Sequence, residues 1–431
     1  MNPRRRRLAA ALAPTMLFGA CLAQGAAGDY ARIPRGELRS VLPAASGRAT
    51  QAVPAFQLRR LPVTNGEFLQ FVRDHPRWQR GRVDGNLADP NYLASWAGPA
   101  ELGTALRSSQ PVTEVSWFAA RAFCESRHAR LPLWNEWERA AAADEHQADA
   151  RRDAAWQARI LGWYSQPTLA HPGPVGQGRP NVFGVSDLHG LIWEWVEDFN
   201  GLFVAADNRV QGDPEQLKFC GAGALSIEDR ENYPSMMRLA LLSSLKARST
   251  TLNLGFRCTY DPQGRASGAM STKAAIDLQD QDGRHLSVEP TGSPRLLTMF
   301  YASCPMACPL TIDTLRAIER ALPAAERARL KVLMVSFDSR RDSPRALRAL
   351  AQERRLDLSR WTLARGSPHE VRSLAALLDI PYRPLPNGGF NHASRLVLVD
   401  GHGGIIARSE RFGVPDPAFI AAIRRALKSA S

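Results

Sequence analysis

The two halves of the chain differ in how hydrophobic and polar residues alternate. Between about residues 29 and 261, short apolar runs are mixed irregularly with Trp, Asn and Gly, which predicts an irregular α+β domain with few long helices. One helix is clear in VSWFAARAFCESRHA, whose apolar positions recur at Trp117, Ala120, Phe123 and Cys124. A second helix is expected to begin near LWNEWERAA.

Between about residues 276 and 428 the pattern becomes regular. The strand-like runs RLLTMFY, KVLMVSFD and WTLA are each followed by a helical period, and SRLVLVD and GIIARSE follow as a pair. Before one of these helices, Ser367 and Glu370 form a capping box with Pro368 at the first helical position. Strands alternating with helices predict a mainly parallel sheet finished by a hairpin, an α/β thioredoxin-like architecture.

Length and composition fit two soluble domains. The chain has 431 residues, more than a single core usually organises, and the Gly- and Ser-containing stretch at 262–275 is typical of a linker. The formal charge is +13, of which Arg4 to Arg7 supply four positive charges. No compact basic stripe with interleaved aromatic residues is present in the sequence, so we expect no nucleic-acid partner.

The first 27 residues have the pattern of a secretory signal. A basic start is followed by an interrupted apolar stretch and small residues, too short for a comfortable membrane span. We expect cleavage after Ala27 and a periplasmic or otherwise exported protein. The alternative is a lipoprotein anchored to the membrane through Cys21, although Phe18 fits that lipidation motif poorly. Export permits disulfide bonds.

A pair of cysteines marks the junction between a strand and a helix of the second domain. Cys304 and Cys308 are separated by three residues in FYASCPMACPLT, and a helix N-terminus favours thiolate. His392, directly before an apolar strand, is a third candidate ligand. Two sulfurs and one imidazole suit copper better than Mg²⁺ or Ca²⁺. From the residues alone, a disulfide, a redox switch and a metal site all remain open.

Three blocks of the second domain resemble the Sco family of copper chaperones. FYASCPMACPLT, MVSFDSRRDSP and GGFNHASRLVLVDGHGG stand in that family's order and spacing, and the resemblance covers about residues 273–427. It implies that Cys304, Cys308 and His392 are copper ligands. It also implies that Asp338 is the acidic residue beside the metal loop; the plainer interpretation is that Asp338 caps a turn.

Four blocks of the first domain resemble the formylglycine-generating enzyme, or sulfatase-modifying factor, family. They are PVTNGEFLQFV, PVTEVSWFAARAFCESRHARLPLWNEWERAA, NVFGVSDLHGLIWEWVED and LNLGFRC. The family's oxidase uses two cysteines upstream of the last block, but residues 226–251 contain none, so we expect a non-catalytic relative. The ending is similar to the branch found with copper nitrite reductases.

The same resemblance implies a disulfide between Cys124 and Cys258. The family's second disulfide falls on Ala141 and Leu239, so that this pair is lost as a whole. Cys220 is left over, either as an inert buried thiol or as a ligand that passes copper between the domains.

The block DLHGLIWEWVED resembles a calcium loop of that family. The resemblance implies carboxylate ligands from Asp187 and Glu194 and backbone carbonyl ligands from Gly190 and Ile192, an all-oxygen set suited to a hard cation. The alternative is that Glu194 is hydrogen-bonded within the core.

Together these observations predict an exported copper-binding assembly factor. It would deliver copper to a client cuproenzyme, which is a terminal oxidase or a copper enzyme of denitrification, and would itself catalyse no reaction. The alternative is a thiol-disulfide oxidoreductase in which Cys304 and Cys308 keep the client's cysteines reduced. A second alternative is an oxidase in the first domain that uses unrecognised residues.

Overall fold

The computed structural model describes residues 28–42, 50–167, 169, 171–202, 232–260, 276–288, 292–304, 307–385 and 388–429. The predicted signal segment, the predicted linker, Cys21 and Cys220 lie outside these ranges. Within the described part of the chain, no helix is long and apolar enough to cross a membrane.

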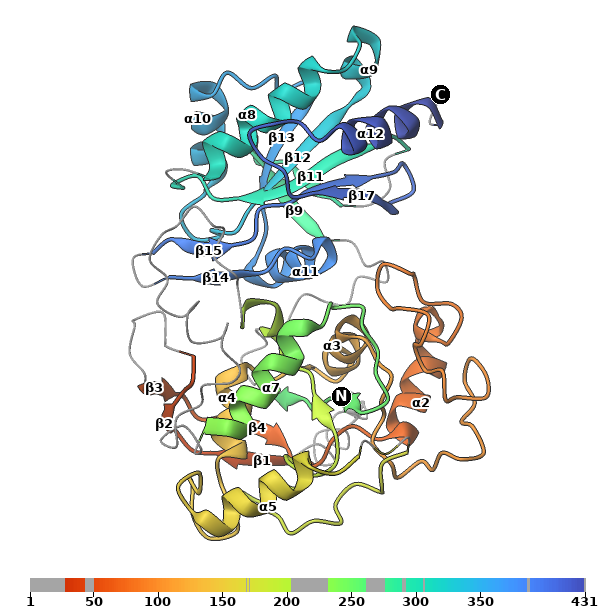
Figure 1. Ribbon diagram of the computed structural model, residues 1–431, viewed down its shortest axis with the longest axis vertical. Coiled ribbons are helices and arrows are strands. Elements are labelled where there is room, and N and C mark those ends of the chain that lie inside the picture. The colour runs from red at the N-terminus through yellow and green to blue at the C-terminus, as the bar shows by residue number, and fades with distance from the viewer. Residues whose placement is uncertain are drawn as a thin grey trace, which may run out of the picture.

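The N-terminal domain combines short strands with helices (Figure 1). A four-stranded sheet has the order β1-β4-β8-β5, with β8 antiparallel to both of its neighbours. The strands are β1 (Tyr30–Ile33), β2 (Gly36–Arg39), β3 (Thr50–Val53), β4 (Phe56–Arg59), β5 (Ala129–Arg130), β6 (Trp193–Glu194), β7 (Leu254–Gly255) and β8 (Thr259–Tyr260). The helices are α2 (Asn65–Asp74), η1 (Pro76–Trp78), α3 (Trp117–Ser126), α4 (Trp134–Ala141), α5 (Ala154–Tyr164), η2 (Phe199–Gly201) and α7 (Tyr233–Ser244).

The core of this domain contains the expected disulfide. Cys124 of α3 is bonded to Cys258 immediately before β8, with the two Cα atoms 5.6 Å apart, which confirms the pairing implied by the family resemblance. Ala141 and Leu239, which stand where the family has its second disulfide, are both buried in the same apolar core. In this chain, the two positions at which the resemblance implies a second disulfide contribute hydrophobic packing.

The C-terminal domain is built on a seven-stranded sheet of order β10-β9-β13-β12-β11-β16-β17. Strands β11, β12 and β13 are parallel, and β16 and β17 form the predicted antiparallel end. The strands are β9 (Asp277–Asp280), β10 (His285–Ser287), β11 (Arg295–Phe300), β12 (Lys331–Ser336), β13 (Trp361–Arg365), β16 (Leu396–Val399) and β17 (Ile405–Ser409), and a separate hairpin pairs β14 (Tyr382–Pro384) with β15 (Phe390–His392). The helices are α8 (Ala307–Arg320), α9 (Ala324–Arg329), α10 (Pro344–Glu353), α11 (Pro368–Leu378) and α12 (Pro417–Ser429).

Both faces of the central strands are buried, as expected for a parallel sheet. In β11, Leu296 faces the core that α8, α10 and α12 form with the sheet, whereas Leu297 faces the core formed with α11. The capping box of Ser367 and Glu370 begins α11 as predicted. This α/β arrangement confirms the thioredoxin-like fold class. Among the described residues, α11 is the only helix that packs against its face of the sheet (Figure 1).

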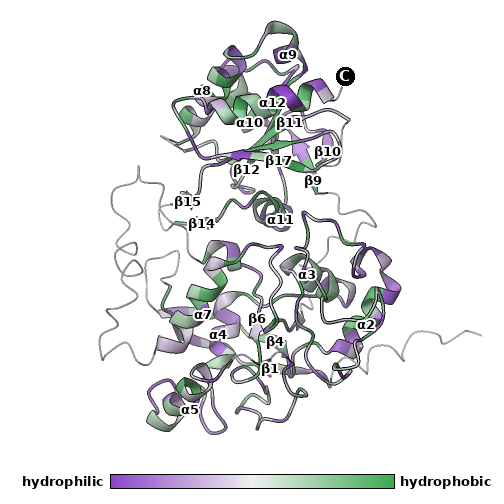
Figure 2. Cartoon of the chain, turned by 45° about the vertical axis from the view of Figure 1, so that its right-hand side comes forward, coloured by the Kyte–Doolittle hydropathy of each residue, from purple (hydrophilic) through white to green (hydrophobic). Residues whose placement is uncertain are grey.

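Helix α11 also contacts the N-terminal domain. Val371 and Leu374 pack on the sheet, but Ala376 belongs to the apolar core of the N-terminal domain. Figures 1 and 2 both show α11 between the two domains. The helix therefore packs in the apolar cores of both domains, and noncovalent contacts as well as the covalent chain connect the two domains.

Charged groups surround this apolar contact. The Oε1 atom of Glu197 lies 2.9 Å from Nη1 of Arg372 and 3.4 Å from Nη2 of Arg121. Nearby, Glu125 Oε1 lies 2.7 Å from Nε2 of His369. Burial alone would raise the pKa of Glu197, but the guanidinium groups of Arg121 and Arg372 outweigh it and hold that pKa below its usual range. Glu197 is therefore ionised at neutral pH.

The lowered pKa of Glu197 predicts a pH dependence of stability. A carboxylate whose pKa is lower in the folded state than in the unfolded state stabilises the folded protein. This contribution is complete at pH values above the unfolded pKa of about 4.5, and it is lost as the pH falls through the folded pKa. We expect Glu197→Gln to cost about 2 kcal/mol at pH 7 and progressively less below about pH 4.5. Urea unfolding between pH 7 and pH 3 measures this difference.

Glu353→Gln is the control, because that side chain is 68% exposed and its change should alter stability little at any of these pH values. A cost of Glu197→Gln that stays constant or grows on acidification would contradict the ion-pair account.

Candidate metal site

The predicted thiol ligands lie where β11 ends and α8 begins. The amide of Cys304 donates to the carbonyl of Tyr301 at 3.1 Å, which closes a turn directly after β11. The Cys304 side chain is half-buried and packs against the cores on both faces of the sheet. Cys308 is the second residue of α8, and its side chain lies outside the described part of the structure.

His392 ends β15 and is buried, with 8% of its surface exposed. Its Nδ1 lies 3.2 Å from the carbonyl oxygen of Ala393. Because a carbonyl can only accept a hydrogen bond, Nδ1 carries the proton, and Nε2 is left with its lone pair. An imidazole oriented by a backbone carbonyl in this way is typical of metal-ligating histidines.

Aromatic contacts bring His392 to the segment that follows β11 and carries Cys304, here called the thiol loop (residues 301–304). The ring of Tyr301, at the start of that loop, meets the His392 ring edge-on at 6.0 Å between centroids. Phe337, which follows β12, lies 5.0 Å from His392 on the same measure. Residues from three separate parts of the sequence thus meet at one end of the sheet, where thioredoxin-like and other open α/β sheets place their functional groups.

Asp338 is buried beside this cluster, and neighbouring groups bond to both of its carboxylate oxygens. Its Oδ1 accepts the amides of Arg340 and Arg341, and its Oδ2 forms an ion pair with Nε of Arg341. Arg341 in turn donates to the carbonyl of Gly388 in the turn between β14 and β15. Asp338 therefore caps a turn, as one prediction had it, and through Arg341 it also holds the hairpin that carries His392.

Asp342 has a similar role on the thiol side, which the sequence analysis missed. Its Oδ2 accepts the amide of Ala302 at 2.8 Å and the hydroxyl of Ser336 at 2.5 Å. Burial raises the pKa of Asp342, although both hydrogen bonds act against that shift. Because Ala302 lies between β11 and Cys304, Asp342 fixes the path of the thiol loop. The second Asp of the SFDSRRDSP block was the available signal.

The predicted calcium set is not assembled in the N-terminal domain, and that prediction is wrong at Glu194. This carboxylate is fully buried and forms an ion pair with Arg257, whose Nη2 lies 2.8 Å from Oε1. Its other oxygen, Oε2, accepts the indole N–H of Trp137 at 2.8 Å. An arginine that occupies both carboxylate oxygens leaves none for a cation. The alternative of a core hydrogen-bonding role for Glu194 is the one that holds.

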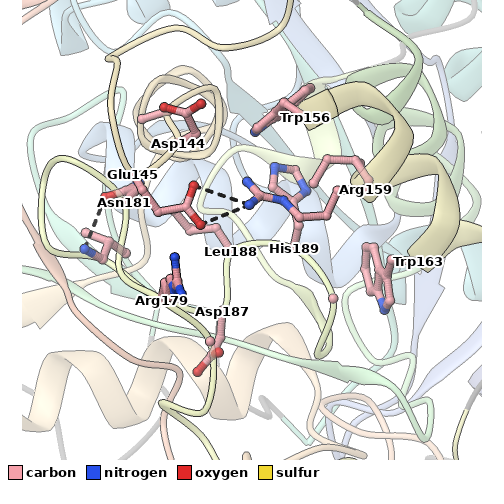
Figure 3. Close-up of a pocket in the computed structure, with 15 residues that line it drawn as sticks. Asp144, Glu145, Trp156, Arg159, Trp163, Arg179, Asn181, Asp187, Leu188 and His189 are labelled. Atoms are coloured by element: carbon pink, nitrogen blue, oxygen red, sulfur yellow. Dashed lines mark hydrogen bonds and ion pairs between the residues drawn. The ribbon is translucent and has the colours of Figure 1, made fainter. Parts of the chain in front are cut away.

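The other predicted calcium ligands lie around a neighbouring pocket. Asp187 and Gly190 line this pocket together with His189 (Figure 3), whereas Ile192 is buried and does not line it. Asp187 Oδ2 accepts the amide of Gly176 at 2.5 Å. Burial lowers the pKa of His189 to about 4, so its imidazole is neutral at pH 7. Among the described side chains, which do not include that of Cys308, no group of three His, Cys, Asp or Glu could hold a metal ion.

Comparison with known families accounts for both domains. The model of the family described as "Sulfatase-modifying factor enzyme 1-like domain" matches residues 23–262. The chain belongs to this family. The SCO1/SenC family model matches residues 265–428, so a SCO1/SenC domain follows the sulfatase-modifying factor domain in the same chain. This confirms the fusion that the sequence motifs suggested.

Individual relatives of the sulfatase-modifying factor domain include enzymes and an inactive homologue. The hercynine oxygenase of Mycolicibacterium smegmatis is 32% identical over 166 residues, which are 33% of this chain and 37% of that protein. The inactive C-alpha-formylglycine-generating enzyme 2 of Bos taurus is 28% identical over 255 residues, 51% of this chain and 81% of that protein. The chain thus spans little more than a third of the length of the first of these relatives.

Solved structures similar to this chain include those of Sco proteins. ScoI of Bradyrhizobium japonicum, with copper bound, is 19% identical, and the match covers 36% of this chain and 98% of that one with a TM-score of 0.31. A SCO1/SenC family lipoprotein of Bacillus anthracis is 20% identical, and the match covers 35% of this chain and 92% of that one with a TM-score of 0.33.

Proposed function

We propose that this chain is an exported copper-binding assembly factor whose SCO1/SenC domain holds Cu(I) through Cys304, Cys308 and His392. Two thiolates and one imidazole form a soft donor set that suits Cu(I). Membership of the SCO1/SenC family supports copper as the cargo. The proposal also includes the predicted export, with delivery to a client cuproenzyme such as a terminal oxidase, a nitrite reductase or a nitrous oxide reductase.

The observation that carries this proposal is the position of His392. A histidine distant from the cysteines in sequence is packed against the thiol loop through Tyr301. Its Nδ1 proton is held by a backbone carbonyl, which leaves Nε2 as the nitrogen able to bind a metal. A plain disulfide or dithiol enzyme would need no such imidazole.

The proposed chemistry of delivery is ligand exchange. A Cu(I) site with three protein ligands is low-coordinate, so a thiolate of the client can bind before Cys304 or Cys308 leaves. The metal keeps its oxidation state, and no net electron transfer is required. In this account the sulfatase-modifying factor domain is non-catalytic, because residues 226–251 lack the family's active-site cysteines.

Copper binding by the His392→Ala variant tests the proposal. We expect the affinity for Cu(I) to fall by roughly a hundredfold, since loss of a ligand should cost at least as much as loss of a residue that only orients one. The measurement is an anaerobic titration of the reduced protein against a competing Cu(I) chelator. The thiols of the variant should remain fully titratable.

The matched control is His402→Ala, a histidine on the exposed turn between β16 and β17, which should leave copper affinity unchanged. If His392→Ala also leaves it unchanged, the three-ligand site is wrong. If that variant instead keeps full activity in reducing a client disulfide, while either cysteine variant loses it, the thiol-disulfide oxidoreductase is the better account. The helix N-terminus at Cys308 is the feature that favours this second function.

A further inference from the structure

We propose that the N-terminal domain positions the copper ligand His392, so that the contact between the two domains sets the affinity of the copper site. The inference rests on the proposed function, because it takes His392 to be a ligand. It assigns to the non-catalytic domain a physical task, which is to hold the β14–β15 hairpin in the conformation that presents the imidazole to the thiol loop.

The first step of the argument is a backbone contact between the domains. Gly201, at the end of η2, lies so close to β14 that a Cβ atom on it would be 2.6 Å from the carbonyl oxygen of Tyr382. Next to it, the Asn200 side-chain amide donates to the carbonyl of Ile380 at 3.2 Å. The segment that leads into the hairpin therefore rests directly on η2 of the N-terminal domain.

The second step leads from this contact to the ligand. Tyr382 and His392 are partners in the register of β14 and β15. The Tyr382 ring also stacks on Phe337 at 4.8 Å between centroids, and Phe337 lies 5.0 Å from His392. A displacement of Tyr382 thus reaches the imidazole through the strand pairing and through a packed aromatic ring.

The third step is the ion pair beneath the hairpin. Arg372 of α11 forms its 2.9 Å ion pair with Glu197 of the N-terminal domain. The charge of Arg372 also acts on the Tyr382 hydroxyl, where it opposes the rise in pKa that burial causes. The Glu197 side chain is 5% exposed and that of Arg372 is 28% exposed, so the pair is only partly accessible to solvent. Side chains as well as backbone therefore join the hairpin to the N-terminal domain.

The two halves of the copper site are supported differently. The thiol loop is held within its own domain, by Asp342 on the amide of Ala302. The β14–β15 hairpin, which carries His392, is held at its turn by Arg341 of the same domain. At its base it is held by Asn200 and Gly201 of the N-terminal domain. A change at the domain contact therefore moves the nitrogen ligand relative to the sulfur ligands, and a geometric mismatch of this kind weakens metal binding.

A double-mutant cycle between Gly201→Ala and His392→Ala tests this inference in the full-length protein, with Cu(I) and a competing chelator as the probe. We expect Gly201→Ala to lower Cu(I) affinity roughly tenfold. In the His392→Ala background the same change should have no further effect, because the ligand that it misplaces is already absent. Gly85→Ala is the matched control, since a Cβ there meets no atom within 4 Å.

Amide hydrogen exchange on the copper-free protein gives a second readout. In Gly201→Ala, exchange should become faster in β14 and β15 and stay unchanged in β11 and β12, which distinguishes a misplaced hairpin from general unfolding. Asn200→Ala, which removes one hydrogen bond without adding bulk, should produce a smaller loss of affinity in the same direction, and it serves if Gly201→Ala does not fold.

The inference is overturned if Gly201→Ala and Asn200→Ala both leave the affinity unchanged, or if either lowers it equally with and without His392. Failure of the proposed function has a different signature. In that case His392→Ala alone leaves the affinity unchanged, and the inference fails with it.

Discussion

Replacing Arg257 with methionine is expected to lower the free energy of unfolding by about 3–5 kcal/mol, the range for breaking a fully buried ion pair by removing one partner. Both side chains of the Arg257–Glu194 pair are 0% exposed. Arg257 also donates to the backbone carbonyls of Arg59, Arg60 and Ser186. The variant therefore leaves a buried carboxylate without its charge partner and removes one donor from each of three backbone carbonyls. Urea unfolding of the disulfide-intact protein measures the loss.

Arg159→Met is the matched control for this prediction. Arg159 and Glu145 also form an ion pair at 2.9 Å, but their side chains are 54% and 26% exposed, respectively (Figure 3). The loss of stability in Arg159→Met should therefore stay below about 1 kcal/mol. Adding Glu194→Met to Arg257→Met should restore part of the lost stability, because the uncompensated charge is removed. Equal effects of Arg257→Met and Arg159→Met would contradict the assignment of Glu194 to the core.

The second large effect is expected at the thiol loop. Cys304→Ser should lower the affinity for Cu(I) by at least roughly a thousandfold, because a hydroxyl replaces one of the two proposed soft ligands. The substitution preserves side-chain size, and Cys304 is only half-buried, so the fold should be unaffected. Competition against a Cu(I) chelator under reducing conditions gives the affinity, and circular dichroism checks the fold.

Ser303→Ala, which changes the exposed neighbour of Cys304 on the same loop, should bind copper like the wild type. A Cys304→Ser protein that still bound Cu(I) tightly would show that the copper site lies elsewhere in the chain.

Local pattern was sufficient to predict most of the C-terminal fold. The runs RLLTMFY, KVLMVSFD and WTLA became β11, β12 and β13, because strands buried on both faces require nearly continuous apolar residues. The beginning of α11 was predictable for a similar reason, since Ser367 and Glu370 satisfy the first amides of that helix locally. In both cases neighbours in sequence determine the structure.

The parts that the sequence did not reveal depend on contacts between distant residues. A family resemblance implied calcium at Glu194, and nothing near this residue in sequence shows that Arg257 is its partner. The contact of Gly201 with Tyr382 likewise joins two domains whose separate patterns carry no sign of it. The β14–β15 hairpin was missed because its strands have only three residues each, too few for a periodicity to emerge.

X-ray absorption at the copper edge of the reduced, Cu(I)-loaded protein tests the central claim most directly. A first shell of two sulfur atoms and one nitrogen atom, with the nitrogen lost in His392→Ala, is the result that this account predicts. A shell of sulfur alone that is unchanged in His392→Ala would contradict it, because Cys304 and Cys308 would then hold the copper without the imidazole.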